Sequence, residues 1–132
     1  METGIELNAD EAMVFLFAVD GELKDLVNEW DPDTGRIPGK QRLAKRPLLE
    51  KIMGKWITAQ GLPSDAAFIP YNKVGPCLLS FSKREVREIK SLTKKMVRKD
   101  GEYITSNSCP EMTRCLKLRQ KAAESFLQKL PV

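Results

Sequence analysis

Apolar and polar residues repeat with the period of an α-helix in four stretches of the chain, and these stretches predict most of the fold. The first begins after Asn8, a residue that favours the position before a helix, and Glu11 completes a capping box three residues later. The nearly continuous apolar run 12–19 predicts a deeply buried helix. We expect residues 20–21 to interrupt this helix, which then resumes and ends before Pro32.

The second and third helical stretches carry similar signals. Pro47 suits the first turn of a helix, and the apolar stripe over 48–57 predicts helix until Gly61. Ser82 opens the third stretch as the first residue of a Ser-x-x-Glu capping box, and the helical period continues to about Lys99.

The last helix is expected to begin with Ser108 as its cap, followed by an early proline. Its apolar face would include Met112, Cys115 and Phe126, which recur at helical spacing. These residues are therefore predicted to lie in the core.

Residues 62–81 follow no clear period. Ser64 is expected to cap a short helical turn over 65–69, and 77–81 is expected to be a short extended piece without a second strand to pair with. The whole pattern predicts a mostly α fold: one compact domain over 1–132, with four to five helices, a basic loop and an irregular central segment.

Charge is distributed unevenly along the chain. Its 132 residues carry a net charge of +4. Residues 1–34 contain ten acids and one base, whereas residues 35–132 contain 21 bases and 8 acids. A basic surface of this size favours polyanions such as nucleic acid. The acidic part is expected either to cover part of that surface or to meet a different partner.

The residue types present exclude several kinds of chemistry. The chain has no histidine, which removes Ser-His-Asp and Cys-His catalysis and His-ligated zinc. The three cysteines, Cys77, Cys109 and Cys115, show no Cys-x-x-Cys spacing. We therefore expect no enzyme activity, no metal site and no cofactor.

The sequence also carries an expectation about location. Its longest apolar run has eight residues, whereas a membrane-spanning helix needs about 20. The sequence opens with Met1-Glu2 and lacks the basic region of a secretory signal, and an odd number of cysteines fits a reducing compartment. An intracellular protein, cytoplasmic or nuclear and without membrane binding, is expected.

The segment 30–47 begins like an acidic calcium loop and ends like a basic phosphate-binding loop. Asp31 and Asp33 stand at alternate positions, as the first ligands of an EF-hand do. Arg36 and Arg42, however, occupy the sixth and twelfth positions, which require glycine and glutamate. A turn is the simpler account of the acidic half.

The basic half of this segment is a candidate anion site. It leads into the helix that begins near Pro47, where free backbone N–H groups and the helix dipole favour an anion, although proline removes one donor. A solvated connector is the alternative. The candidate residues are Arg36, Lys40, Arg42, Lys45 and Arg46.

A sharper signal is a row of five bases on the third helix. The row, called the α-helical basic stripe below, consists of Lys83, Arg87, Lys90, Lys94 and Arg98. These bases fall within an arc of about 80° and over a length of about 22 Å. Glu85 and Glu88 lie off the row, so no i, i+4 acid neutralises it. The row contains no amide, which favours contacts to phosphates over reading of bases.

Aromatic side chains near the basic segments are candidates for stacking on bases. Tyr71 and Tyr103 lie in expected loops, where each could contact an unpaired base. Trp56 and Phe126 fall on apolar stripes and are predicted to be core residues.

These observations favour a non-catalytic nucleic-acid-binding protein. RNA is preferred over DNA because nothing in the sequence resembles a helix-turn-helix with a base-reading helix. The alternative is a protein–protein interaction module or a self-assembling structural protein, in which the acidic part meets a basic face on another copy. A solvated basic face is the plainest reading of the stripe, and the modest apolar arc of its helix argues against a membrane-bound helix.

Overall fold

The computed structural model describes residues 2–63, 69–106 and 108–131. The elements are, in chain order, β1 (Thr3–Leu7), α1 (Ala9–Val27), α2 (Lys40–Leu43), α3 (Arg46–Ala59), the 3-10 turn η1 (Tyr71–Lys73), β2 (Cys77–Phe81), α4 (Lys83–Ser106) and α5 (Pro110–Lys129). The predicted mostly α fold is confirmed, with one short sheet added. The turn expected over 65–69 lies outside the described residues.

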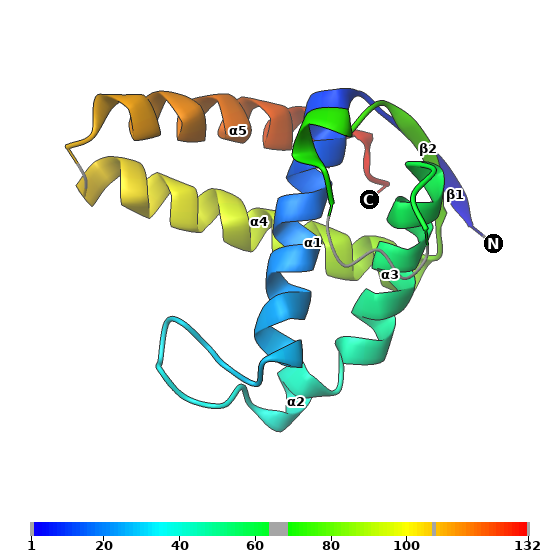
Figure 1. Ribbon diagram of the computed structural model, residues 1–132, viewed down its shortest axis with the longest axis horizontal. Coiled ribbons are helices and arrows are strands. Elements are labelled where there is room, and N and C mark those ends of the chain that lie inside the picture. The colour runs from blue at the N-terminus through cyan, green and yellow to red at the C-terminus, as the bar shows by residue number, and fades with distance from the viewer. Residues whose placement is uncertain (1, 64–68, 107, 132) are drawn as a thin grey trace.

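Figure 1 shows α1 crossing the middle of the molecule. On one side of it α4 and α5 project side by side as a long hairpin, and on the other side lie α3 and the β1–β2 ribbon. Helix α4 passes behind α1 and continues on the side of α3. Helix α1 contacts α3, α4 and α5, so it holds the two sides together.

The predicted capping box at the start of α1 is confirmed. The Asn8 side chain accepts a hydrogen bond from the Glu11 backbone N–H (2.8 Å), and the Glu11 carboxylate accepts one from the Asn8 N–H (2.9 Å). The interruption predicted at residues 20–21 is wrong, because α1 continues through Gly21 to Val27. A glycine inside a helix costs only about 1 kcal/mol, and buried residues on both sides of it outweigh that cost.

The end of α1 also differs from the prediction. The helix stops at Val27, and Glu29 adopts a positive φ of 51°. Trp30 is therefore outside the helix and 52% exposed. The turn predicted after it is confirmed: the Asp31 N–H donates to the Arg36 carbonyl (2.8 Å), and Gly35 has the positive φ that favours glycine.

The centre of the core is a cluster of aromatic rings around Phe15 of α1. Phe15 stacks on Trp56 of α3 and on Phe81 of β2, and it meets Phe126 of α5 edge to face. The Trp56 indole N–H donates to the Ala12 carbonyl (3.1 Å), which satisfies the one polar group of this side chain. The predicted core positions of Trp56 and Phe126 are confirmed.

The extended piece predicted over 77–81 is β2, but the expectation that it has no partner is wrong. It pairs antiparallel with β1, so that Thr3 lies opposite Phe81 and Leu7 lies opposite Cys77. In β1 only Ile5 and Leu7 are buried, and two inward-facing residues in five give too short a period-2 signal to stand out.

Helix α4 is longer than the sequence suggests. Its capping box is confirmed, with the Ser82 N–H bonded to the Glu85 carboxylate (2.8 Å) and the Glu85 N–H bonded to the Ser82 hydroxyl (3.2 Å). The predicted end near Lys99 is wrong: the helix continues to Ser106. An ion pair between buried Asp100 and half-buried Arg119 of α5 links the two helices where α4 was expected to break.

Helix α5 begins at Pro110, with Cys109 at the cap position and no side-chain cap bond, so the predicted Ser108 cap is wrong. Met112 and Cys115 were predicted to be core residues, but both are exposed. The first half of α5 belongs to the projecting part of the hairpin (Figure 1), where no third helix or strand among the described residues covers this face.

Candidate nucleic-acid interface

The α-helical basic stripe lies along the outer face of α4. Val86, Ile89 and Leu92 fix this orientation, because they are buried on the opposite side of the helix. Four of the five stripe residues are exposed, and Lys90 is half-buried. The helix therefore presents the predicted row of bases to solvent.

Three stripe bases carry charge that nothing in the described chain neutralises. Lys83, Arg87 and Lys94 have no acidic partner within 4 Å among residues 2–63, 69–106 and 108–131. Lys90 donates to the Pro131 carbonyl (2.8 Å), a neutral acceptor that leaves its charge uncompensated. The expectation that no i, i+4 acid neutralises the row is wrong at one position, because Arg98 lies 3.9 Å from Glu102. Both side chains are about 70% exposed, and such surface pairs are weak.

The stripe borders a small pocket at the start of α4. The pocket measures about 220 Å³, and its lining includes Lys83, Arg87 and Lys90 together with Thr3 and Pro131. An anionic group that entered this pocket would meet three cations and no acid from its lining. The positive charge of the stripe is thus most concentrated at this end.

The basic loop is organised differently, because its central arginine, Arg42, forms ion pairs with two acids. Helix α2, which the sequence did not reveal, positions Arg42 so that two of its nitrogens bind the Glu22 carboxylate (2.7 and 3.0 Å) and a third binds Asp31 (2.8 Å). The Glu22 side chain is only 8% exposed. A two-pronged contact with a buried carboxylate has a structural role.

Two other loop bases are also paired within the chain. Lys45 contacts Glu88 of α4 (3.3 Å), and Arg46 contacts Glu50 one turn along α3 (2.8 Å). Of the five bases proposed in this loop, Arg36 and Lys40 alone have no acidic partner in the described part of the chain. Helical spacing identifies rows of charge, but it does not show which charges tertiary folding pairs.

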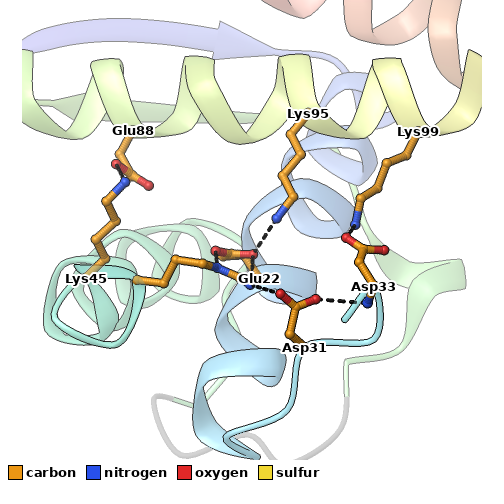
Figure 2. Close-up of polar contacts among 8 residues, drawn as sticks. Glu22, Asp31, Asp33, Lys45, Glu88, Lys95 and Lys99 are labelled. Atoms are coloured by element: carbon orange, nitrogen blue, oxygen red, sulfur yellow. Dashed lines mark hydrogen bonds and ion pairs between the residues drawn. The ribbon is translucent and has the colours of Figure 1, made fainter. Parts of the chain in front are cut away.

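Acids from the N-terminal part cover one flank of α4. Figure 2 shows Lys95 reaching Glu22 (3.2 Å) and Lys99 reaching Asp33 (2.6 Å). The same picture shows the Asp33 backbone held by the Asp31 carboxylate (2.9 Å). The two lysines beside the stripe are therefore neutralised, whereas the stripe is not.

The pKa values agree with a fully ionised cluster. Burial alone would raise the pKa of Glu22, but hydrogen bonds and charge from Arg42 and Lys95 lower it below the ordinary value. The Asp33 N–H and, to a lesser extent, the charge of Arg42 lower the pKa of Asp31. Asp25 behaves oppositely, because burial and the neighbouring Glu22 raise its pKa.

Neither tyrosine lies with the stripe. Tyr71 is 52% exposed in η1 and packs edge to face on Phe17 of α1 (5.6 Å between ring centres). Tyr103 was expected in a loop but lies within α4, about half a turn round the helix from the stripe. A base that stacked on either ring would lie away from the row of cations.

Other kinds of site find little support in the part of the chain that the structure describes. No group of three or more cysteine, aspartate or glutamate side chains there is arranged to hold a metal ion. No helix there combines the length and apolar character needed to cross a bilayer. Cys77 is half-buried, which raises the pKa of its thiol.

The fold and the stripe together define a small, mostly helical domain with one unneutralised basic helix face. Comparisons of the chain with protein-family models, with curated proteins and with solved structures found no match. The functional argument is therefore built on this chain's own residues.

Proposed function

We propose that this protein binds nucleic acid, without catalysis, through the basic stripe of α4. The observation that supports this most is the selective pattern of ion pairing. Lys95 and Lys99 on the flank of α4 are bound by acids of the same chain, whereas Lys83, Arg87 and Lys94 are exposed and without an acidic partner in the described residues. Unpaired cations in a row release counterions when they meet phosphates, which is the main source of affinity for nucleic acid.

The basic loop has a smaller part in this proposal. Arg36 and Lys40 are exposed and can add phosphate contacts, while Arg42, Lys45 and Arg46 are occupied by acids. RNA remains the preferred ligand over DNA, since no base-reading helix supports a sequence-specific contact with DNA.

The self-assembly alternative has less support. It needs acids of the N-terminal part to be available to a second copy. Glu11, Glu22 and Asp33 are bound to bases of their own chain instead. These three acids are thus paired within the molecule and are not available to a second copy.

The proposal predicts the effect of removing three charges from the stripe. The variant Lys83→Gln, Arg87→Gln, Lys94→Gln should bind labelled RNA at least about tenfold more weakly than the wild type at low salt. Each neutralised phosphate contributes about 0.7 (single strand) to 0.9 (duplex) to the slope of log affinity against log salt, so removal of three contacts should lower that slope by up to about 2.1 to 2.7. Fluorescence anisotropy over a salt series measures both quantities.

The matched control removes the same charge from other faces. Lys24→Gln, Lys51→Gln, Lys73→Gln changes three exposed lysines on α1, α3 and η1 and should leave affinity and slope nearly unchanged. Equal loss in the two variants would mean that net charge alone matters, which contradicts a stripe site. Micromolar or weaker binding of the wild type to every RNA and DNA at low salt would overturn the proposed function itself.

A further inference from the structure

Helix α5 carries a second set of exposed bases that sequence spacing alone did not connect with the stripe. Arg114, Lys117 and Lys121 are exposed, and none has an acidic partner in the part of the chain that the structure describes. At 3.6 residues per turn the three side chains fall within an arc of about 60° on α5. They form a short basic row of their own.

Contacts along the hairpin show where this row faces. On one flank of α5, Gln120 lies beside Gly101 of α4, and on the other flank Ser125 donates to Glu11 of α1 (2.6 Å). The buried side contains Leu116 and Phe126. The three bases lie between the two flanks and opposite the buried side, so they point outward on the same face of the hairpin as the stripe.

The register of the two antiparallel helices shows which residues of the two rows are at the same level along the hairpin. Asp100 pairs with Arg119, and Lys90 reaches Pro131, so residue numbers across the hairpin sum to about 220. Lys121 is therefore level with Arg98, where the stripe ends. Lys117 and Arg114 continue the row along α5, level with the last turns of α4 (Figure 1).

The combined row is about 35 Å long at 1.5 Å per residue, from Lys83 to the level of Arg114. This is close to one helical turn of B-form duplex, about 34–36 Å. The row lies on two packed helices, so it is stiff, and it steps sideways by about 8–10 Å, the distance between packed helix axes, where it passes from α4 to α5. The bases that form it are not interleaved with aromatic side chains. Proteins that hold single strands combine basic grooves with aromatic platforms, whereas stiff rows of cations without such platforms suit the regularly spaced phosphates of a duplex.

We propose that the ligand is double-stranded nucleic acid, bound along a continuous track that runs from the α4 stripe onto Lys121, Lys117 and Arg114 of α5. This inference rests on the proposed function and adds to it both the class of ligand and three residues. Duplex RNA and duplex DNA offer the same phosphate chemistry, and separate measurements distinguish them.

The test uses the full chain and four 20-nucleotide probes: duplex RNA, duplex DNA, oligo-U and oligo-dT. The wild type should bind at least one duplex about tenfold or more tightly than either single strand at equal salt. The variant Arg114→Gln, Lys117→Gln, Lys121→Gln should weaken duplex binding at least about tenfold and lower its salt slope by up to about 2.7. The Lys24, Lys51, Lys73 control removes equal charge elsewhere and should keep wild-type affinity.

A second variant tests the track by removing a negative charge beside it, which should strengthen binding. Glu124 is exposed one turn along α5 from Lys121, so its carboxylate repels a phosphate on the track. Glu124→Gln should strengthen duplex binding by a few-fold. Because this side chain is exposed and makes no hydrogen bond or ion pair within the described part of the chain, its substitution does not put folding at risk.

The outcomes separate the two proposals. Binding by the wild type that the α4 variant abolishes and the α5 variant leaves intact would overturn the track but keep the stripe. Single strands bound as tightly as duplexes would overturn the assignment of a duplex ligand. Absence of binding to all four probes would overturn the proposed function and the track with it.

Discussion

Glu11 is a carboxylate with no exposed surface, and it joins the two ends of the described chain. Besides closing the cap of α1, it accepts hydrogen bonds from the Ser125 hydroxyl (2.6 Å) and from the Lys129 ammonium of α5. Burial alone would raise its pKa, but these bonds and the Asn8 N–H lower it. The charged form of this side chain is therefore part of the native structure.

Removal of this carboxylate should be costly. Glu11→Ala leaves the Lys129 ammonium and the Ser125 hydroxyl without their acceptor. Because the Lys129 side chain is 39% exposed, its charge stays solvated, and the loss of hydrogen bonds to a charged group costs about 1.5–3 kcal/mol of unfolding free energy. Urea denaturation measures the loss. Asp10→Ala, an exposed acid in the same first helical turn, is the control and should cost under about 1 kcal/mol. Similar losses in the two variants would contradict the role given to Glu11.

At the scale of single residues, the sequence predicted contacts between residues a few positions apart but not contacts between residues far apart in the chain. The cap formed by Asn8 and Glu11 depends on residues three apart, so it was visible in the sequence. The contacts of Glu11 with α5 join positions more than one hundred residues apart, and no periodicity encodes them. Cys115 was wrongly assigned to the core because its spacing fits an apolar face, and spacing does not show that no other element of the described chain covers that face.

Among the elements, α4 depends most on how it begins. The Ser82 hydroxyl satisfies one of the free N–H groups of its first turn, and Glu85 returns a bond to the Ser82 backbone while also binding Lys55 of α3 (2.8 Å). The cap thus fixes the helix that carries the basic stripe against α3.

Loss of the cap hydroxyl should lower stability by a moderate amount. Ser82→Ala removes the acceptor for the Glu85 N–H, and such cap substitutions cost about 1 kcal/mol. Ser91→Ala, at an exposed position in the middle of α4, should be neutral or slightly stabilising because alanine favours helix. Urea or thermal unfolding of the pair measures the difference, and equal midpoints would show that the cap contributes nothing.

Helices were predictable as elements, whereas their limits and the sheet were less so. The period of apolar residues identified α1, α3, α4 and α5, and caps located the starts of α1 and α4. The continuation of α4 past Lys99 is supported by the ion pair of Asp100 with Arg119, which meet only in the folded hairpin. The sheet pairs two five-residue strands that lie about seventy residues apart, and no pattern within either strand predicts the other.

Three buried acids are expected to make the stability of the whole molecule depend on pH. Glu11, Glu22 and Glu85 each have a pKa lowered from the ordinary 4.5, since bonds from lysine, arginine or backbone N–H groups overcome the effect of burial. As pH falls, the unfolded chain therefore takes up protons before the folded chain does. The stability that these groups supply is complete above about pH 4.5 and is lost below it.

Unfolding measured from about pH 7 to pH 3 at constant ionic strength should show this loss. The urea midpoint is expected to hold steady down to about pH 5 and then to fall steeply. Asp25, whose pKa is raised, offsets a small part of the decline. The Glu11→Gln variant should show a lower midpoint at neutral pH and a shallower fall in acid. A midpoint that is insensitive to pH in this range would contradict the assignment of native charge to these acids.

The candidate interface was partly visible in the sequence. A row of bases on one helix depends only on helical geometry, so its exposure was predictable. The pairing of Arg42 with Glu22, and the continuation of the row onto α5, depend on how separate segments come together. A charge count over 35–132 could not distinguish bases that stabilise the fold from bases that face solvent.

The β1–β2 pairing has a consequence for the order of folding. The paired residues include Thr3 with Phe81 and Leu7 with Cys77, so formation of the sheet closes a loop of about seventy residues. Closing a loop of this length costs conformational entropy. The helices need only local contacts to begin forming, and contacts between distant residues slow folding. During synthesis β1 is made about seventy residues before β2, so its edge stays unpaired until β2 has been made, and an unpaired strand edge on a nascent chain is a site where aggregation can begin.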